Sequence, residues 1–291
     1  MTGHLNPIDR TEHTTERDNA MTEIKPRFRT IDGLSIRYAE SDEPHEREAL
    51  LLSPWPESLY SYDATWSKLA RHARLVAVDL PGFGHSELRA DLLSPTAMGE
   101  FIVRIADEFG LVAPHVVGPD IGTAASLFAA ARHPGRFRTL VVGTGGTAVP
   151  LALGNPLKDW VLTEDLAPYR ALGPKAAVTV AMQTINGYRL PDVVREDYLA
   201  SYVGQRFVDQ LPYVRAYPAE LPVLRDLLPT LETPVQILAG RDDAVVPPEN
   251  AEYLHAHLPN SKLDIIDAGH FAWEENADDY ADVITRWWQA H

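Results

Sequence analysis

Residues 116–123 read Val-Val-Gly-Pro-Asp-Ile-Gly-Thr and join an apolar run to a segment of small residues, TAASLFAAA (123–131). The apolar run is typical of a buried strand, and the segment after it is typical of a closely packed helix. Gly118 and Gly122 flank Asp120 and allow the sharp strand-to-helix turn that lifts a side chain above a sheet. Asp120 then has two interpretations: a helix cap, or a nucleophilic carboxylate at a helix N-terminus.

Apolar runs alternate with helical stretches on both sides of this turn. Asp32-Gly33 lies between two strand-like runs and predicts a β-hairpin, while Ser94 predicts the start of a helix that Gly110 ends. Runs of Val, Ile and Leu without strict alternation indicate strands buried on both faces, and their alternation with helices indicates a parallel sheet. We therefore expect an α/β fold with a mostly parallel sheet flanked by helices, and with further strands at 49–53, 74–80, 115–118, 139–143, 235–240 and 263–269.

Between residues 147 and 232 the strand pattern stops, and the sequence becomes helical in character and rich in proline and tyrosine. An all-helical insertion of this size between two strands predicts a cap over the sheet. We assign residues 21–146 and 233–291 to the α/β core, and 147–232 to a helical cap inserted after the sixth strand. Residues 1–20 are polar and aperiodic, so we expect them to form a flexible N-terminal tail.

Two further reactive side chains follow strands of the predicted sheet. Asp243 comes shortly after the strand at 235–240, and His270 comes directly after the strand at 263–269. Because ligands of parallel sheets bind beyond the carboxyl ends of the strands, these side chains and Asp120 should converge at one edge. In chain order the three match a nucleophile, an acid and a base.

These motifs establish a resemblance that covers residues 27–290. The chain resembles the α/β-hydrolase superfamily, specifically its aspartate-nucleophile branch of soluble epoxide hydrolases and haloalkane dehalogenases. The resemblance implies an α/β-hydrolase fold, with Asp120 as nucleophile, His270 as base, and Asp243 rather than Asp242 as the acid. It rests on the turn around Asp120 and on the motifs Asp79–Ser86 (DLPGFGHS), Gly240–Asp243 (GRDD) and Gly269–Phe271 (GHF).

The loop that carries the family's oxyanion donor departs from the usual pattern. Epoxide hydrolases of this type usually have His-Gly-x-Pro-Glu-Ser there, whereas residues 53–58 of this chain read Ser-Pro-Trp-Pro-Glu-Ser. The resemblance places the oxyanion donors at the backbone N–H groups of Trp55 and Ile121, a role that needs no particular side chain. The alternative interpretation of residues 53–58 is a surface turn made rigid by proline.

The resemblance also implies a mechanism in two steps. Asp120 attacks a carbon atom and forms an ester, and His270, oriented by Asp243, deprotonates the water that hydrolyses this ester. The oxyanion that forms during hydrolysis is bound by the N–H groups of Trp55 and Ile121.

The group that leaves the substrate carbon decides the reaction. Haloalkane dehalogenases hold the halide with a Trp after the nucleophile, but here Ile121 follows, and residues 121–125 lack the arginines of fluoroacetate dehalogenases. Epoxide opening needs an acid, usually cap tyrosines, and Tyr213 or Tyr217 occupies the place of the second one. Trp160 is expected to contribute to the substrate pocket.

We therefore expect an epoxide hydrolase that produces a vicinal diol. A dehalogenase or another carbon–heteroatom hydrolase is the alternative, and a ligand-binding protein without turnover on the same scaffold is a third. An ester or lactone hydrolase is disfavoured because the turn holds Asp120 in place of a serine.

Charge and composition restrict the partners of this chain. Its 26 Lys and Arg against 41 Asp and Glu give a net charge of −15, which disfavours nucleic acids and anionic membranes. The chain has no cysteine, which excludes a disulfide scaffold and thiolate metal sites. Without a membrane-spanning apolar run or a signal peptide, a cytoplasmic location is expected. We expect a small hydrophobic substrate and neither metal nor cofactor, and we leave the oligomeric state open, with a homodimer as one option.

Overall fold

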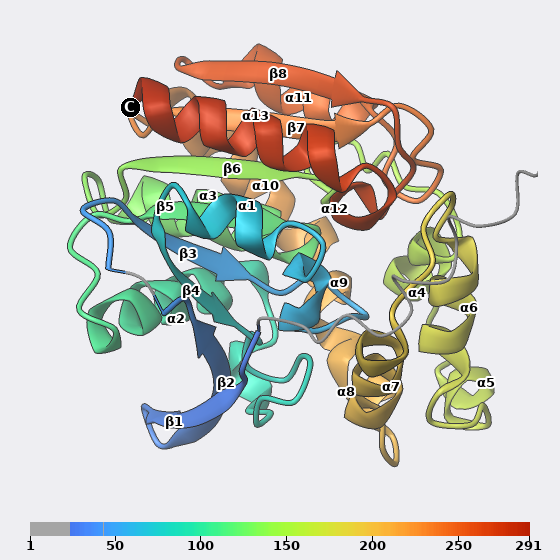
Figure 1. The fold of residues 1–291 in the computed structure, drawn as a ribbon. Coiled ribbons are helices and arrows are strands. Elements are labelled where there is room, and N and C mark those ends of the chain that lie inside the picture. Colours follow the sequence, from blue (N-terminus) through green and yellow to red (C-terminus); the bar gives the residue numbers. More distant parts are fainter. Residues whose placement is uncertain (1–23, 43) are drawn as a thin grey trace, which may run out of the picture.

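An eight-stranded sheet forms the centre of the molecule (Figure 1). The computed structural model describes residues 24–42 and 44–291, so the tail expected at 1–20 lies outside the described residues. The strand order is β1-β2-β4-β3-β5-β6-β7-β8. β2 pairs antiparallel with both β1 and β4, and every later neighbour in the order pairs parallel. The strands are Arg27–Ile31 (β1), Leu34–Glu40 (β2), Glu48–Leu52 (β3), Arg74–Val78 (β4), His115–Pro119 (β5), Thr139–Gly143 (β6), Val235–Gly240 (β7) and Ser261–Ile266 (β8).

The central strands are buried on both faces, as their unbroken apolar runs predict. Every residue of β5, β6 and β7 is buried, whereas β1 at the edge of the sheet is exposed at four of its five residues. The prediction of strands buried on both faces is therefore confirmed for β5, β6 and β7. The strand pairing described above also confirms the prediction of a mostly parallel sheet. The strand β8 begins at Ser261 and ends at Ile266, so its predicted range of 263–269 was displaced toward the C-terminus.

Local sequence signals explain where the hairpin between β1 and β2 turns and where helix α2 begins. Asp32 and Gly33 have φ angles of 48° and 80°, which a tight hairpin turn requires, and Ile31 pairs with Leu34 across it. Helix α2 (Pro95–Glu108) begins after Ser94, whose side chain accepts a hydrogen bond from the Ala97 N–H. Both predictions are confirmed.

Helices cover the two faces of the sheet in separate layers (Figure 1). On one face α2 packs against α3, and on the other face α1 packs against α13. The 3₁₀ helix η1 contacts α12, which follows the last strand. The helices of this core are η1 (Leu59–Tyr62), α1 (Trp66–Ala70), η2 (Ala90–Leu92), α2, α3 (Ile121–Arg132), α11 (Glu249–His257), α12 (Ala272–Glu275) and α13 (Ala277–Ala290).

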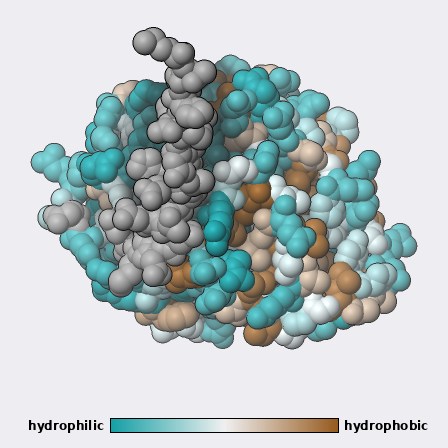
Figure 2. Space-filling model, turned by 45° about the vertical axis from the view of Figure 1, so that its right-hand side comes forward, coloured by the Kyte–Doolittle hydropathy of each residue, from teal (hydrophilic) through white to brown (hydrophobic). Residues whose placement is uncertain are grey.

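The chain between β6 and β7 is helical, and we call residues 144–234 the helical insertion. In Figure 1 the helices α4 to α8 gather beside the sheet, whereas α10 lies behind it and packs against α3. The face of the molecule in Figure 2 carries both hydrophilic and apolar patches. Several large apolar side chains of the insertion are exposed, among them Leu162, Leu172 and Val180. The helices of the insertion are α4 (Leu157–Leu162), α5 (Ala167–Arg170), α6 (Ala176–Thr184), α7 (Asp192–Ser201), α8 (Arg206–Gln210), α9 (Pro212–Arg215), α10 (Tyr217–Leu227) and η3 (Leu228–Thr230).

A single connected core of buried apolar residues runs through the sheet layers and into the helical insertion. It joins strand residues such as Val117 to insertion residues such as Tyr213 and Leu221. Within residues 24–42 and 44–291, none of the helices combines the length and apolar character needed to cross a lipid bilayer.

Candidate active site

Asp120 lies in a strained turn between β5 and α3. Its φ and ψ angles are 50° and −118°, a conformation that non-glycine residues rarely adopt. The Asp120 N–H donates to the carbonyl of Gly143, which holds the turn against the end of β6. Gly118 is required by close approach, since a Cβ there would lie 2.4 Å from Ser126 Oγ. At Gly122 a Cβ would meet only ordinary contacts, so that glycine is not required in the same way.

The interpretation of Asp120 as a simple helix cap is wrong. Asp120 occupies the N-cap position of α3, but its side chain makes no capping hydrogen bond. Its carboxylate instead accepts a hydrogen bond from the backbone N–H of Trp55, at 2.8 Å from Oδ2. The side chain is therefore directed across the turn toward the loop at 53–58.

Asp120, Asp243 and His270 meet at the carboxyl edge of the sheet, as the positions after three strands predict. His270 Nδ1 lies 2.9 Å from Asp243 Oδ2, and His270 Nε2 lies 3.9 Å from Asp120 Oδ1. The second oxygen of Asp243 accepts from the N–H groups of Val245 and Val246, at 2.8 Å each. Asp243 is thus fixed by its own loop and can orient the imidazole.

The carboxylate of Asp120 has two distinct oxygens. Oδ2 is bound by the Trp55 N–H, and the backbone N–H of Ile121 also acts to lower the pKa of this carboxyl. Oδ1 faces His270 Nε2 at a distance too long for a direct hydrogen bond. One oxygen is therefore held by Trp55, one of the two backbone donors expected to bind an oxyanion, and the other faces the imidazole.

Burial and charge set the ionisation of these groups. Burial raises the pKa of Asp120, while His270 and the N–H groups of Trp55 and Ile121 act against this effect. Burial alone would lower the pKa of His270, but the charge and hydrogen bond of Asp243, with the charge of Asp120, raise it overall. The site therefore favours a basic carboxylate beside an imidazole that is stabilised when it takes up a proton.

The two candidate acid tyrosines belong to the surroundings of Asp120. Tyr213 and Tyr217 are fully buried, with their rings 6.2 Å apart, and the charge of Asp120 acts on both. The Tyr213 hydroxyl donates to the carbonyl of Ile121 at 2.6 Å. Burial raises the pKa of both phenols well above the usual value, so both are weaker acids than a phenol in water.

Trp160 belongs to an aromatic cluster around Trp55. The Trp160 ring packs edge-on against Trp55 and Phe207, at 5.1 Å in each case, and Phe207 stacks on Trp55 at 5.4 Å. The structure thus brings Trp160 next to the loop that binds the Asp120 carboxylate.

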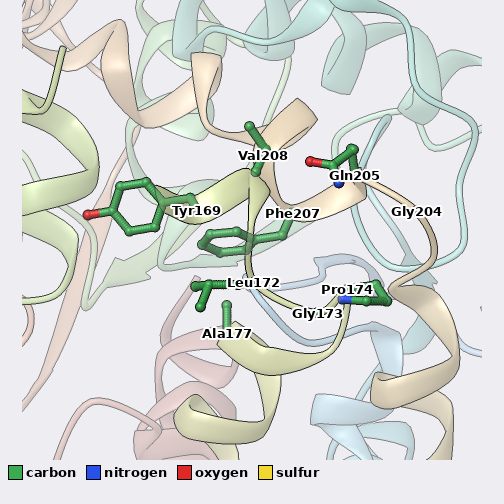
Figure 3. A pocket seen from close by; sticks show the side chains of 9 residues that line it. All are labelled: Tyr169, Leu172, Gly173, Pro174, Ala177, Gly204, Gln205, Phe207 and Val208. Carbon is green, nitrogen blue, oxygen red and sulfur yellow. The ribbon is translucent and has the colours of Figure 1, made fainter. Parts of the chain in front are cut away.

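A small pocket opens within the helical insertion, close to this aromatic cluster (Figure 3). Phe207 is shared between the pocket and the stack on Trp55, whereas Asp120 and His270 do not line the pocket. Its lining is mainly apolar, which suits a hydrophobic ligand. The pocket is lined by Tyr169, Leu172, Gly173, Pro174, Ala177, Gly204, Gln205, Phe207 and Val208.

Two contacts of the site have no signal in the sequence. Gln210 accepts from the Trp55 indole Nε1 at 2.6 Å and donates to the carbonyl of Gly82 at 2.8 Å. Glu57 accepts from Trp273 Nε1 at 2.8 Å, and it lies inside the motif at 53–58 without having been assigned a role. Among the described residues, no group of three or more His, Asp or Glu side chains is arranged to hold a metal ion.

Comparisons with known proteins identify the family to which this chain belongs. The alpha/beta hydrolase fold family matches residues 50–277. The chain is 28% identical to 2-hydroxymuconate semialdehyde hydrolase of Pseudomonas putida over 226 residues, which are 72% of this chain and 75% of the relative. It is 27% identical to pimeloyl-[acyl-carrier protein] methyl ester esterase of Neisseria meningitidis over 250 residues, which are 81% of this chain and 91% of that enzyme.

Solved structures agree with this family at the level of the fold. Cfl2 from Burkholderia cenocepacia has a TM-score of 0.77 at 21% identity, and the match covers 91% of this chain and 96% of Cfl2. The enol-lactonase from Burkholderia xenovorans has a TM-score of 0.75 at 16% identity, with 91% and 100% covered. From the family match, the sheet order and the helical layers together, the chain belongs to the alpha/beta hydrolase fold family and is a hydrolase of that family.

Proposed function

We propose that this hydrolase is an epoxide hydrolase that works through a covalent ester on Asp120. The observation that carries the proposal is the position of the Asp120 carboxylate, with Oδ2 on the backbone N–H of Trp55 and Oδ1 toward His270. In an acyl-transfer enzyme those donors bind the carbonyl oxygen of the substrate. Here the Trp55 donor already binds the nucleophile, which suits attack on a saturated carbon.

In the first step, Asp120 Oδ1 attacks an epoxide carbon, and the bond from that carbon to the epoxide oxygen breaks. The oxygen takes a proton from Tyr217, or from Tyr213 once the Tyr213 hydroxyl leaves the carbonyl of Ile121. An alkoxide is much more basic than a phenolate, so even a phenol of raised pKa can deliver this proton. The products are a hydroxyalkyl ester on Asp120 and a tyrosinate.

In the second step, His270 Nε2 takes a proton from water, and the hydroxide attacks the ester carbonyl carbon. The resulting oxyanion is held by the N–H groups of Trp55 and Ile121. The tetrahedral intermediate then releases the diol oxygen, which takes the proton from His270. The acid proton left on Asp120 returns to the tyrosinate, so the net reaction adds one water to the epoxide.

The contacts of Trp55 favour an epoxide over a haloalkane. A departing halide needs N–H donors that are free to bind it, and the Trp55 indole N–H already donates to Gln210. The Ile121 side chain, directly after Asp120, has no donor at all. A buried phenol, in contrast, can give a proton to an oxygen leaving group, which a halide does not require.

The helical insertion acts as the cap in this proposal. It supplies Tyr213 and Tyr217, and the aromatic cluster around Trp55 and Trp160 supports a small hydrophobic substrate. The closed, apolar surroundings exclude bulk water, which strengthens the electrostatic interactions of the charged groups.

The proposal is tested by turnover of an epoxide panel that begins with styrene oxide, after dialysis against EDTA. The expected product is the vicinal diol, and Asp120→Ala should abolish its formation. Parallel assays follow halide release from 1-bromobutane and hydrolysis of p-nitrophenyl acetate. Faster release of halide or nitrophenol than of diol would reject the epoxide assignment, and binding without turnover on all three substrates would favour a ligand-binding protein.

A further inference from the structure

Gln210 connects the helical insertion to two loops of the core beside the candidate active site. It is the last residue of α8 and is 1% exposed. Its Oε1 accepts a hydrogen bond from the Trp55 indole Nε1 at 2.6 Å, and its Nε2 donates to the carbonyl of Gly82 at 2.8 Å. An indole N–H can only donate and a carbonyl can only accept, so a neutral carboxamide in this orientation satisfies both.

The same helix also covers a face of the Trp55 indole. Phe207, three residues before Gln210 on α8, stacks on Trp55 with the ring centroids 5.4 Å apart and the planes within 12° of parallel. Residues three apart lie on the same side of a helix. Helix α8 therefore contacts the ring face and binds the ring N–H of the same indole.

Helix α8 is itself fixed on the core through the loop at 82–86. Arg206, one turn before Gln210, donates to three carbonyls of residues 83–86, and Gln210 binds the carbonyl of Gly82. The place of α8 on this loop therefore determines where the carboxamide meets the Trp55 indole.

The indole and the donor that binds Asp120 belong to one residue in a stiff loop. The backbone N–H of Trp55 donates to Asp120 Oδ2 at 2.8 Å. Pro54 and Pro56 flank Trp55, and a proline ring fixes its own φ angle. Few backbone rotations are left around Trp55, so a displacement of the indole is passed on to the backbone N–H.

We propose that Gln210 is a positioning residue, which aligns the backbone N–H of Trp55 with Asp120 Oδ2 by holding the indole in place. In the proposed function, Oδ2 becomes the carbonyl oxygen of the ester, and negative charge develops on it during hydrolysis. Loss of Gln210 should therefore slow ester hydrolysis more than ester formation. This catalytic consequence rests on the proposed function, whereas the alignment of the Trp55 N–H does not.

The alignment is tested by hydrogen exchange, followed by NMR on the complete chain labelled with ¹⁵N-tryptophan. The chain has six tryptophans, and the signals of Trp55 are assigned by their loss in Trp55→Phe. Gln210→Met keeps the length of the side chain and removes both hydrogen bonds. In this variant the indole and backbone N–H groups of Trp55 should both exchange at least about tenfold faster than in the wild type. Rates are taken relative to the backbone N–H of Trp288, which is buried in α13, so that a general loss of stability cancels.

Gln236→Met is the matched control for this exchange experiment. Gln236 is also 1% exposed, but it lies on β7 and donates to the Lys262 carbonyl and to Asp264. Its substitution should leave the relative rates of Trp55 within about twofold of the wild type. Faster exchange of the indole alone would overturn the positioning role, and unchanged exchange of both groups would show that Gln210 does not hold the indole.

The catalytic consequence is tested by intact mass spectrometry during turnover of styrene oxide. Removal of an oxyanion donor costs about 10²–10³-fold, so its misalignment in Gln210→Met should slow ester hydrolysis by about 10- to 100-fold and let the ester on Asp120 accumulate. Trp55→Phe, which lacks the indole N–H, should act in the same way, and the double variant should add little to either single substitution. Gln236→Met should accumulate no more ester than the wild type.

The outcomes separate the inference from the function on which it rests. If the wild type turns over and Gln210→Met does so without accumulated ester, the catalytic role is overturned. Absence of epoxide turnover in every variant, the wild type included, would reject the proposed function and leave the exchange rates to decide on the alignment of Trp55.

Discussion

Asp120 combines a strained backbone with a side chain bound at only one of its oxygens. Its φ of 50° is maintained because the Asp120 N–H is held by Gly143 and Gly118 leaves room beside Ser126. Such strain is characteristic of functional positions in proteins. Relaxation of the turn would move the carboxylate away from Trp55, so strain and reactivity belong to the same residue.

The covalent mechanism predicts different behaviour for His270 and Asp120. Ring opening by Asp120 needs no base, whereas hydrolysis of the ester needs the water that His270 deprotonates. His270→Gln mixed with styrene oxide should therefore gain one substrate mass, seen by intact mass spectrometry and mapped to the peptide of Asp120. Asp120→Ala is the control and should gain none. An unmodified His270→Gln that still forms diol would show that water attacks the epoxide directly.

Substitution of Tyr213 or Tyr217 should slow the first step, ester formation, and spare the second, ester hydrolysis. This is the opposite of the effect expected for His270→Gln. Removal of the phenol that protonates the epoxide oxygen should slow ester formation by about 10²–10⁴-fold, while hydrolysis of an ester already formed changes little. Stopped-flow single-turnover measurements on Tyr213→Phe and Tyr217→Phe check this. Tyr38→Phe on β2 is the matched control. Full activity in both cap variants would assign the acid to another phenol, such as Tyr169 or Tyr188.

At the scale of elements, α7 and α8 bind the helical insertion to the core. Asp197 on α7 pairs with Arg37 on β2 at 2.5 Å and accepts from Ser58 Oγ at 2.6 Å. The pKa of Asp197 is lowered to about 2, since hydrogen bonds from His85 and Arg37 outweigh the effect of burial. Arg206 on α8 donates to three carbonyls in the loop at 83–86. The candidate cap is therefore attached to the core through buried charges.

The Arg37–Asp197 pair should make a measurable contribution to stability. Removal of one partner leaves a buried charge poorly compensated, so Asp197→Ala should lower the free energy of unfolding by about 3 kcal/mol. Asp192→Ala, which removes an exposed pair with Arg195 on the same helix, should change it by less than about 1 kcal/mol. Urea unfolding at pH 7 measures both. Equal effects of the two substitutions would mean that the buried pair has no special role.

The same Asp197 pair also predicts a loss of stability in acid. Its folded pKa of about 2 lies below the unfolded value near 3.9, so its stabilising contribution is present above pH 4 and disappears as pH falls toward 2.

Local patterns and distant contacts differ in how far the sequence predicts them. The hairpin at Asp32, the helix after Ser94 and the buried strands follow from turn chemistry, capping and apolar runs, which act within a few residues. The convergence of Asp120, Asp243 and His270 follows from the rule for the carboxyl ends of parallel strands. The contacts of Trp55 with Gln210 and of Glu57 with Trp273 span 155 and 216 residues. They depend on how the insertion and α12 pack, for which a single sequence has no local pattern.

At the scale of the whole molecule, the net charge of −15 surrounds a site that is itself rich in carboxyl groups. A field of this sign repels anions at distances comparable to the Debye length, which is about 30 Å at 0.01 M salt and about 8 Å at 0.15 M. Neutral substrates do not experience this repulsion, so charge distinguishes them from anionic ones before they reach the site.

The salt dependence of turnover should therefore differ between matched neutral and anionic epoxides. For an epoxide that carries a carboxylate, such as phenylglycidate, kcat/KM should rise by about two- to tenfold as NaCl increases from 0.01 to 0.15 M, because screening removes the repulsion. For styrene oxide, kcat/KM should stay constant over the same range. Sodium sulfate at equal ionic strength is the control for specific effects of chloride. If kcat/KM of the anion falls with salt, a local cation must bind the substrate carboxylate, and the overall negative field then does not govern access to Asp120.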